Sequence, residues 1–284
     1  MLRASARVLA HRGIAAGSFR LDGKTGPVFV RSHSNLMRRV YWFGTEGHEP
    51  ELAALLPVLA SRSHAILEVG ANVGYHTVQM ASSFTGDSFV AVEANPTAAA
   101  ELRANLAANE LQIDVAEVAA TPEPAGTVSL AIPNTSRSDT PGNTRLADFS
   151  AFSTNMRKVT LVEVESRAVT DLVPEGMDLL KLDVEGMETV LLSALEEKIR
   201  RTRPIIVVEA LDERNELREW LDRLIMTNYR VLLPSTSAIH GCVDITETQW
   251  TDRGTQAATR QRDVVMAPPE SWLVAALDRE AATS

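Results

Sequence analysis

The sequence predicts an α/β fold built on a mostly parallel sheet with helices on both faces. Three observations support this prediction. From residue 64 onward, short apolar runs alternate with helical patterns, which is typical of parallel strands joined by crossover helices. The chain has 284 residues, 45% of them hydrophobic, enough for one large buried core. A glycine-containing turn, "EVGANVGYHT" (68–77), directly follows the first apolar run.

The first part of the chain predicts six elements. Asn95 is a candidate N-cap, because its side chain can accept a backbone N–H, and Pro96 suits the first helical position. Leu102 and Leu106 share one face of the helix that follows. In order, the elements are a helix at 50–62 beside the first strand, a strand at 64–70, a helix at 74–83, a strand at 88–94, the helix opening at Asn95, and a strand at 113–120.

Residues 121–160 break this alternation. They are rich in Ser, Thr, Asn, Pro and Gly, which predicts a strand at 127–132 leading into a long surface loop. Loops of this length in compact domains often bind ligands. Residues 158–167 predict an extended strand that pairs with 127–132.

The alternation then resumes. "LLKLDVEG" (179–186) is the fourth core strand. One helix follows it, with Glu188 in the first turn and basic residues at its end, as the helix dipole favours. Pro204 ends that helix. The remaining elements are a strand at 204–210, a helix whose apolar face includes Leu217 and Trp220, and closing strands at 229–234 and 262–269 that form an antiparallel pair.

Composition narrows the class of protein. The formal net charge of -9 disfavours nucleic acid as a partner, because nucleic-acid binders usually present a basic face. The single cysteine, Cys242, predicts a buried thiol and a reducing, cytoplasmic setting. No apolar run approaches the roughly 20 residues of a membrane span. The first 20 residues are basic and free of acids, which suits a short helix or tail and also imitates a transit peptide.

The turn at 68–77 predicts a nucleotide-like ligand. In open α/β sheets, ligands bind beyond the carboxyl ends of the strands. The dinucleotide pattern G-x-G-x-x-G is absent, since Asn72 replaces its middle glycine. Glu93 ends the second strand, where an acid can accept both ribose hydroxyls. Glu68 would repel a pyrophosphate and attract a cation, so the turn suits S-adenosylmethionine better than a nicotinamide dinucleotide. The alternative is that Gly70 and Gly74 only shape the turn.

Three motifs, "ILEVGANVGYHT", "VAVEANPTAAAELRANLAAN" and "LLKLDVEGMETVLL", together resemble the FkbM family of S-adenosylmethionine-dependent methyltransferases. The resemblance runs from about residue 46 to 210 and includes "EGHEPEL" before the first strand. It implies a class I methyltransferase (Rossmann-like) sheet of seven strands, the last antiparallel. It also implies methyl transfer to a hydroxyl of a sugar, polyketide or other natural product. We therefore expect an N-terminal extension at 1–45 and a methyltransferase domain at 46–284, with an inserted segment at 121–167.

The resemblance also implies a cofactor site. The methionine part of the cofactor would lie against Glu68, Gly70, Asn72 and Gly74, and its ribose against Glu93. Ala120 would pass near the adenine. The neighbouring residues assigned to the same site are Ala71, Thr77, Ala94, Asn95 and, from the segment before the first strand, Glu49.

The charges in "LLKLDVEG" are the candidate catalytic groups. Lys181, Asp183 and Glu185 stand at alternate positions and therefore face one side of a strand. Asp183 would orient the acceptor hydroxyl, take its proton, or hold the amino group of the cofactor; Glu185 is the second candidate. Lys181 would pair with a carboxylate such as Glu68, because a lone buried charge is costly. The alternative is a purely structural ion-pair cluster.

Three further expectations complete the site. His76, in the first helical turn, is a weaker catalytic candidate. Asp183 and Glu209 end adjacent strands, as in catechol O-methyltransferase-like enzymes, so Mg²⁺ is conceivable, although no compact ligand motif supports it. The chain could act as a homodimer. The rival functions are a nicotinamide-dependent oxidoreductase and a non-catalytic binding protein on the same sheet.

Overall fold

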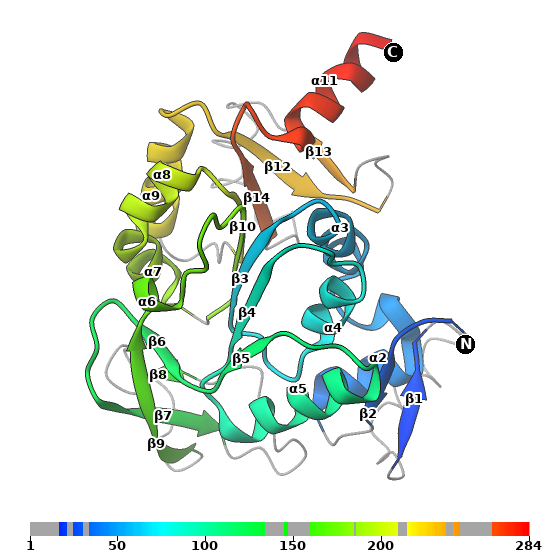
Figure 1. The fold of residues 1–284 in the computed structure, drawn as a ribbon, viewed down its shortest axis with the longest axis vertical. Helices are drawn as coiled ribbons and strands as arrows, with labels where there is room; N and C mark the ends of the chain where they lie inside the picture. The colour runs from blue at the N-terminus through cyan, green and yellow to red at the C-terminus, as the bar shows by residue number, and fades with distance from the viewer. Residues whose placement is uncertain are drawn as a thin grey trace.

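The computed structural model has the α/β architecture that the sequence predicts, with a central sheet and helices on both faces (Figure 1). The residues that the structure describes are 17–21, 25–30, 34–133, 145–146, 159–184, 186–209, 215–236, 241–244 and 263–283.

Within these residues the main sheet has the strand order β13-β12-β14-β11-β10-β3-β4-β5. Strands β3, β4, β5, β10 and β11 are parallel, and β14 is antiparallel to both of its neighbours. The seven expected strands are present, and a short edge strand, β13, adds an eighth. Their bounds are β3 Ala65–Val69, β4 Ser88–Val92, β5 Asp114–Ala116, β10 Leu179–Leu182, β11 Ile205–Glu209, β12 Arg230–Pro234, β13 Cys242–Asp244 and β14 Asp263–Ala267.

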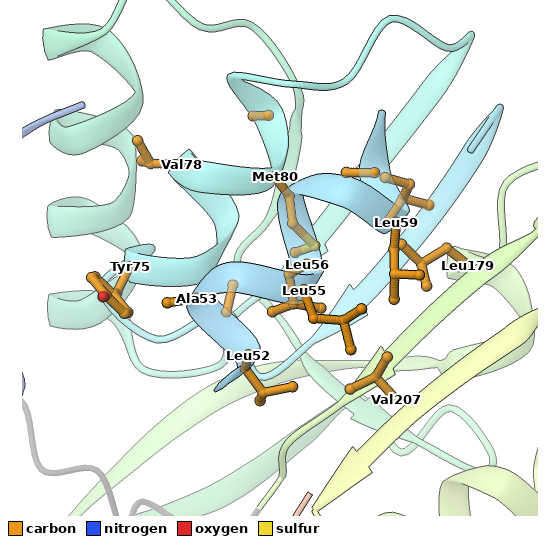
Figure 2. Close-up of a cluster of buried hydrophobic side chains, with 14 of the residues drawn as sticks. Leu52, Ala53, Leu55, Leu56, Leu59, Tyr75, Val78, Met80, Leu179 and Val207 are labelled. Carbon is orange, nitrogen blue, oxygen red and sulfur yellow. The ribbon is translucent and has the colours of Figure 1, made fainter. Parts of the chain in front are cut away.

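One face of the sheet is covered by α3 (Pro50–Ala60), α4 (Tyr75–Ala81) and α5 (Pro96–Ala108). Figure 2 shows the leucines of α3 packed among Met80, Leu179 and Val207. Helix α5 begins as predicted, since the Asn95 side chain accepts the N–H of Thr97 and Pro96 follows it. The C-terminal α11 (Trp272–Thr283) adds Leu273 and Val274 to the same core.

The other face is covered by α6 (Val169–Leu172), α7 (Glu188–Ala194), α8 (Glu196–Thr202) and α9 (Asn215–Ile225). The prediction of one continuous helix after β10 is wrong, because two helices, α7 and α8, meet at Leu195 (φ -88, ψ -2). Both helices direct leucine and isoleucine side chains into the core. The apolar spacing therefore continues through the junction and matches that of a single helix.

A second, four-stranded sheet has the order β6-β9-β7-β8. Its strands are β6 (Ala119–Thr121), β7 (Thr127–Pro133), β8 (Arg145–Leu146) and β9 (Val159–Ala168). The predicted pairing of 127–132 with 158–167 is confirmed by β7 and β9, which run antiparallel. The single strand predicted at 113–120 is wrong. Its first half is β5 in the main sheet, and its second half pairs with β9 as β6. Most of the predicted loop lies outside the described residues.

The N-terminal segment packs on the domain. It forms a hairpin of β1 (Ser18–Arg20) and β2 (Val28–Val30), followed by α2 (Asn35–Phe43) and the 3₁₀ turn η1 (Gly44–Gly47). Phe29, on β2, is fully buried in the core. The side chains of Asn105, on α5, and Asn109, the residue that caps its C-terminal end, hydrogen-bond the backbone of β2.

The thiol of Cys242 is buried, as predicted. Among the described residues, no helix combines the length and the hydropathy that a membrane span requires.

Asn105→Ala should destabilise the protein. The buried Asn105 amide accepts the N–H of Val30 (2.7 Å) and donates to the carbonyl of Val73 in the glycine turn (2.7 Å). Removing it leaves two backbone groups without partners, which costs roughly 2–4 kcal/mol in free energy of unfolding. Urea denaturation measures this cost. The exposed Ala104→Gln, on the same helix, should change stability by less than about 0.5 kcal/mol; equal losses in both variants would contradict the assignment.

Candidate functional site

Polar residues form a row along the carboxyl edge of the sheet. Glu209, on β11, and Asp263, on β14, are register partners. The parallel registers end one residue earlier, at Val92, Val69, Leu182 and Val208. The next residue along each strand therefore lies in the same row, and these residues are Glu93, Gly70, Asp183 and Glu209. The sheet changes its direction of strand addition between β3 and β10, which is where α/β sheets bind ligands. We call this row the carboxylate edge.

Behind the carboxylate edge lies a buried ion pair. Lys181 and Glu68 are register partners on β10 and β3, and Lys181 Nζ lies 3.3 Å from Glu68 Oε1. The hydroxyl of Thr77, on α4, donates to the other Glu68 oxygen (2.7 Å). Burial alone would lower the pKa of Lys181, but Glu68 and Asp183 outweigh it and raise that pKa. The predicted pairing of Lys181 with Glu68 is confirmed.

Asp183 lies between this pair and solvent. Its backbone N–H donates to the carbonyl of Val69 (3.0 Å), which extends the parallel ladder past the end of β10. Its carboxylate lies 3.6 Å from Lys181 Nζ, and the side chain is 35% exposed. Lys181 and Asp183 therefore face the same side, as predicted. Asp183 is therefore a carboxylate that a small ligand can reach from solvent. Glu185 lies outside the described residues.

The glycine turn is shaped by packing. Gly70 has a φ of +89, and a Cβ built on it would lie 1.8 Å from the carbonyl oxygen of Asp183. Gly74 has a φ of +84, and its Cβ would lie 2.5 Å from a methyl carbon of Leu102. The N–H groups of Gly70 and Ala71 both donate to the carbonyl of Val92. Packing alone therefore explains why both positions are glycine, and only the acidic residues around the turn indicate a ligand.

Glu93 holds the turn against the second strand. Its two oxygens accept the N–H groups of Asn72 and Asn95, each at 2.7 Å. Burial raises the pKa of Glu93 to about 7; the two hydrogen bonds oppose this shift, and the charges of Asp183 and Glu68 add to it. Each oxygen keeps a second lone pair that can accept a hydroxyl.

A second polar cluster joins α3 and α4. Glu49 precedes α3 in a left-handed conformation (φ 41, ψ 61). Its carboxylate lies 2.9 Å from His76 Nε2 and 3.5 Å from His48 Nε2. Burial would raise the pKa of Glu49, but the two histidines lower it to about 2. Burial lowers the pKa of His48 to about 4. We call these three residues the His–Glu–His cluster.

Asp263 is the acid that sequence reasoning missed at the edge. Burial raises its pKa to about 8, and the charges of Glu49 and Asp183 add to the shift. The sequence pattern that could have identified Asp263 is an acidic residue directly before an apolar strand. His48 was also missed, although it lies in the quoted "EGHEPEL" segment. Because Glu49 influences the pKa values of both Asp263 and Lys181, the His–Glu–His cluster and the carboxylate edge share one electrostatic environment.

The predicted site residues thus fall into three groups. Glu68, Thr77 and Asp183 meet around Lys181, Asn72 and Asn95 meet at Glu93, and Glu49 meets His76. Ala94 is half-buried against the second core. Ala120 pairs with Arg167 in the smaller sheet, so its place beside an adenine stays a prediction.

The strand order, with β14 antiparallel beside β11, is that of the class I methyltransferase sheet. A sequence model described as the methyltransferase FkbM domain matches residues 68–231, more than half of the chain. The chain therefore belongs to the FkbM methyltransferase family, and the resemblance noted from its motifs is confirmed.

Solved structures with a similar fold include the FkbM methyltransferase of Methylobacillus flagellatus KT (14% identity, TM-score 0.41), covering 81% of this chain and 54% of that one. This chain thus spans about half the length of that protein. An O-methyltransferase from Bacillus cereus, solved with S-adenosylhomocysteine, has 13% identity and a TM-score of 0.41, covering 77% and 81% of the two chains. TomG from Streptomyces achromogenes, an O-methyltransferase of tomaymycin synthesis solved with S-adenosylmethionine, has 12% identity and a TM-score of 0.42, covering 77% and 80%. Comparison with curated proteins gave no match.

Gly70→Ala should destabilise the protein for two reasons, the positive φ of this residue and the close contact that a methyl group would make. A positive φ alone costs an alanine about 1–2 kcal/mol. At Gly70 the added methyl also meets the Asp183 carbonyl, which adds about 1–3 kcal/mol. Gly126→Ala is the matched control, because Gly126 has a φ of +74 and open space around its Cβ. Urea denaturation should show the larger loss for Gly70→Ala, and equal losses would contradict the close approach of β3 to β10.

Lys181→Met should leave Glu68 buried without a countercharge. Breaking a buried ion pair on one side costs about 3–5 kcal/mol, measured as free energy of unfolding at pH 7. The double variant Lys181→Met/Glu68→Gln should recover most of this loss. In the single variant the loss should shrink as the pH falls, because Glu68 would then fold with a raised pKa and bind a proton. A single variant as stable as wild type would contradict the assigned pairing.

Proposed function

We propose that this protein is an S-adenosylmethionine-dependent O-methyltransferase that acts on a hydroxyl of a small metabolite. The observation that carries the proposal is the half-exposed Asp183 carboxylate at the carboxylate edge, beside the turn that joins β3 to α4. Membership of the FkbM family supports the methyltransferase class over the nicotinamide-dependent alternative.

The residues present suit the cofactor. Glu93 can accept ribose hydroxyls with its remaining lone pairs while it holds Asn72 and Asn95. The carboxylates of Asp183 and Glu49 give this region negative charge, which favours the sulfonium and ammonium groups of S-adenosylmethionine. Glu68 is already paired with Lys181 and Thr77, so its contribution is to position Lys181 and α4.

Asp183 is the proposed catalytic residue. When bound, S-adenosylmethionine would supply the methyl group by cleavage of its S–CH₃ bond, with S-adenosylhomocysteine as the leaving group. The oxygen of the acceptor hydroxyl would gain the C–O bond and lose its proton. Asp183 would orient that hydroxyl and accept its proton, while Lys181 stabilises the ionised carboxylate. Alignment of the reacting groups supplies about 7–11 kcal/mol in favourable cases, and a general base adds roughly 10²–10⁴-fold.

The proposal is tested first by cofactor binding. Calorimetric titration of the purified chain with S-adenosylhomocysteine should give saturable, micromolar binding, whereas NADH and NADPH should give none. Binding of a nicotinamide cofactor alone would overturn the proposal. Formation of S-adenosylhomocysteine from S-adenosylmethionine is then screened with sugars, polyketides and other hydroxyl compounds. Cofactor binding without turnover on any acceptor would favour the non-catalytic binding protein.

Asp183→Asn should separate catalysis from binding. We expect a loss in turnover of about 10²–10⁴-fold, because the amide cannot accept the proton, with affinity for S-adenosylhomocysteine changed less than tenfold. Asp171→Asn, an exposed acid on α6, is the charge-matched control and should keep full turnover. Full turnover in Asp183→Asn would exclude Asp183 as the base.

A further inference from the structure

The His–Glu–His cluster has the composition of a metal site with open coordination positions. Imidazole and carboxylate oxygen are ligands of first-row transition ions, and His48, Glu49 and His76 each offer one such atom within 4.8 Å of the others. We propose that these three residues bind a divalent transition-metal ion of the Zn²⁺ type.

The distances suit such an ion. Zn²⁺ binds His nitrogen and carboxylate oxygen at about 2.0–2.2 Å, which puts two ligands of a tetrahedral site about 3.3–3.5 Å apart. Glu49 Oε2 lies 2.9 Å from His76 Nε2, and Glu49 Oε1 lies 3.5 Å from His48 Nε2. One ligand atom from each of the three residues lies within 4.8 Å of the others, so side-chain adjustment would bring all three to the spacing that the ion requires.

The surroundings hold the ligands in place. His76 is buried, and its ring packs 4.9 Å from the ring of Tyr75 and 5.6 Å from that of His48. Its Nδ1 has no hydrogen-bond partner within the described part of the chain, so Nε2 makes its only polar contact there. Glu49 is held in the left-handed region directly before Pro50, a costly conformation for such a residue. The fold thus keeps the Glu49 carboxylate in contact with both imidazole rings at the cost of backbone strain.

The charges around the cluster are mixed. Lys181 is engaged by Glu68 and Asp183, and the positive charges of Lys181 and Arg39 both act on His48. The carboxylate of Glu49 is the negative charge that a bound cation would contact directly. The plain alternative is that both imidazoles donate hydrogen bonds to Glu49 and no ion binds.

Three protein ligands leave at least one coordination position open, as in catalytic zinc sites. The His48 and Glu49 side chains are 22% and 33% exposed, so the open side meets solvent and could take an oxygen ligand. Mg²⁺ and Ca²⁺ prefer oxygen-only sites, so this site differs in its ligands from the Mg²⁺ site considered at Asp183 and Glu209. The inference does not depend on the proposed function, and its test needs neither cofactor nor acceptor.

The test uses the full chain without an affinity tag, stripped with a chelator and titrated with Co²⁺ as a spectroscopic probe. We expect one equivalent to bind with micromolar affinity and to give visible absorption bands of a four- or five-coordinate ion. Zn²⁺ should displace Co²⁺ and raise the melting temperature, because an ion that binds only the folded state stabilises it.

The variants are His48→Ala and Glu49→Gln, with His64→Ala as the control. His48 and Glu49 are partly exposed, so these variants should fold, which circular dichroism checks. Each of these two variants should weaken Co²⁺ binding at least about tenfold. His64 is exposed and lies outside the cluster, so His64→Ala should leave Co²⁺ affinity unchanged. Absence of saturable Co²⁺ binding below about 1 mM in wild type would overturn the proposal, as would unchanged binding in both cluster variants.

Discussion

The contact on which the site depends is the buried ion pair of Lys181 and Glu68 in the middle of the sheet. The two residues are register partners at the point where β10 joins β3, so a slip of either strand by one residue would bury both charges without compensation. The same pair connects α4 through Thr77 and the carboxylate edge through Asp183. A single polar contact thus specifies strand register, helix position and the local electrostatic field together.

This arrangement explains how an acidic chain can keep reactive groups at one edge. Lys181 lies behind the edge, with its Nζ 3.3 Å from Glu68 and 3.6 Å from Asp183. Burial raises the pKa values of Glu93 and Asp263. The two histidines beside Glu49 lower the pKa of that acid instead. Neighbouring acids therefore differ in proton affinity because of their burial and their partners.

Much of this could be predicted from the sequence, because the responsible patterns are local. Alternating charges in "LLKLDVEG" predicted a shared face and the Glu68 partner, and Asn95-Pro96 predicted a helix start. The breaks at Glu117–Val118 and at Leu195 were missed, since both sides of each break keep the same apolar pattern. Strand β13 and helix α11 were not predicted either. His48 and Asp263 depend on contacts between segments far apart in the chain, which spacing alone cannot show. The hydrogen bond from the Asn72 N–H to the Glu93 carboxylate likewise joins two segments that are separate in the sequence.

The attachment of the N-terminal hairpin has a practical consequence for where this domain can be cut. The region that matches the family starts at residue 68, yet Phe29 fills the core beside α5, and Asn105 connects β2 to the glycine turn. A fragment cut at the family boundaries would lack Phe29, so the apolar surface that this side chain covers would face water. The side-chain amides of Asn105 and Asn109 would also lose their partners on β2. Expression boundaries are therefore better drawn from the packing of α5 than from the extent of the family match, with the hairpin kept as an integral part of the folding unit.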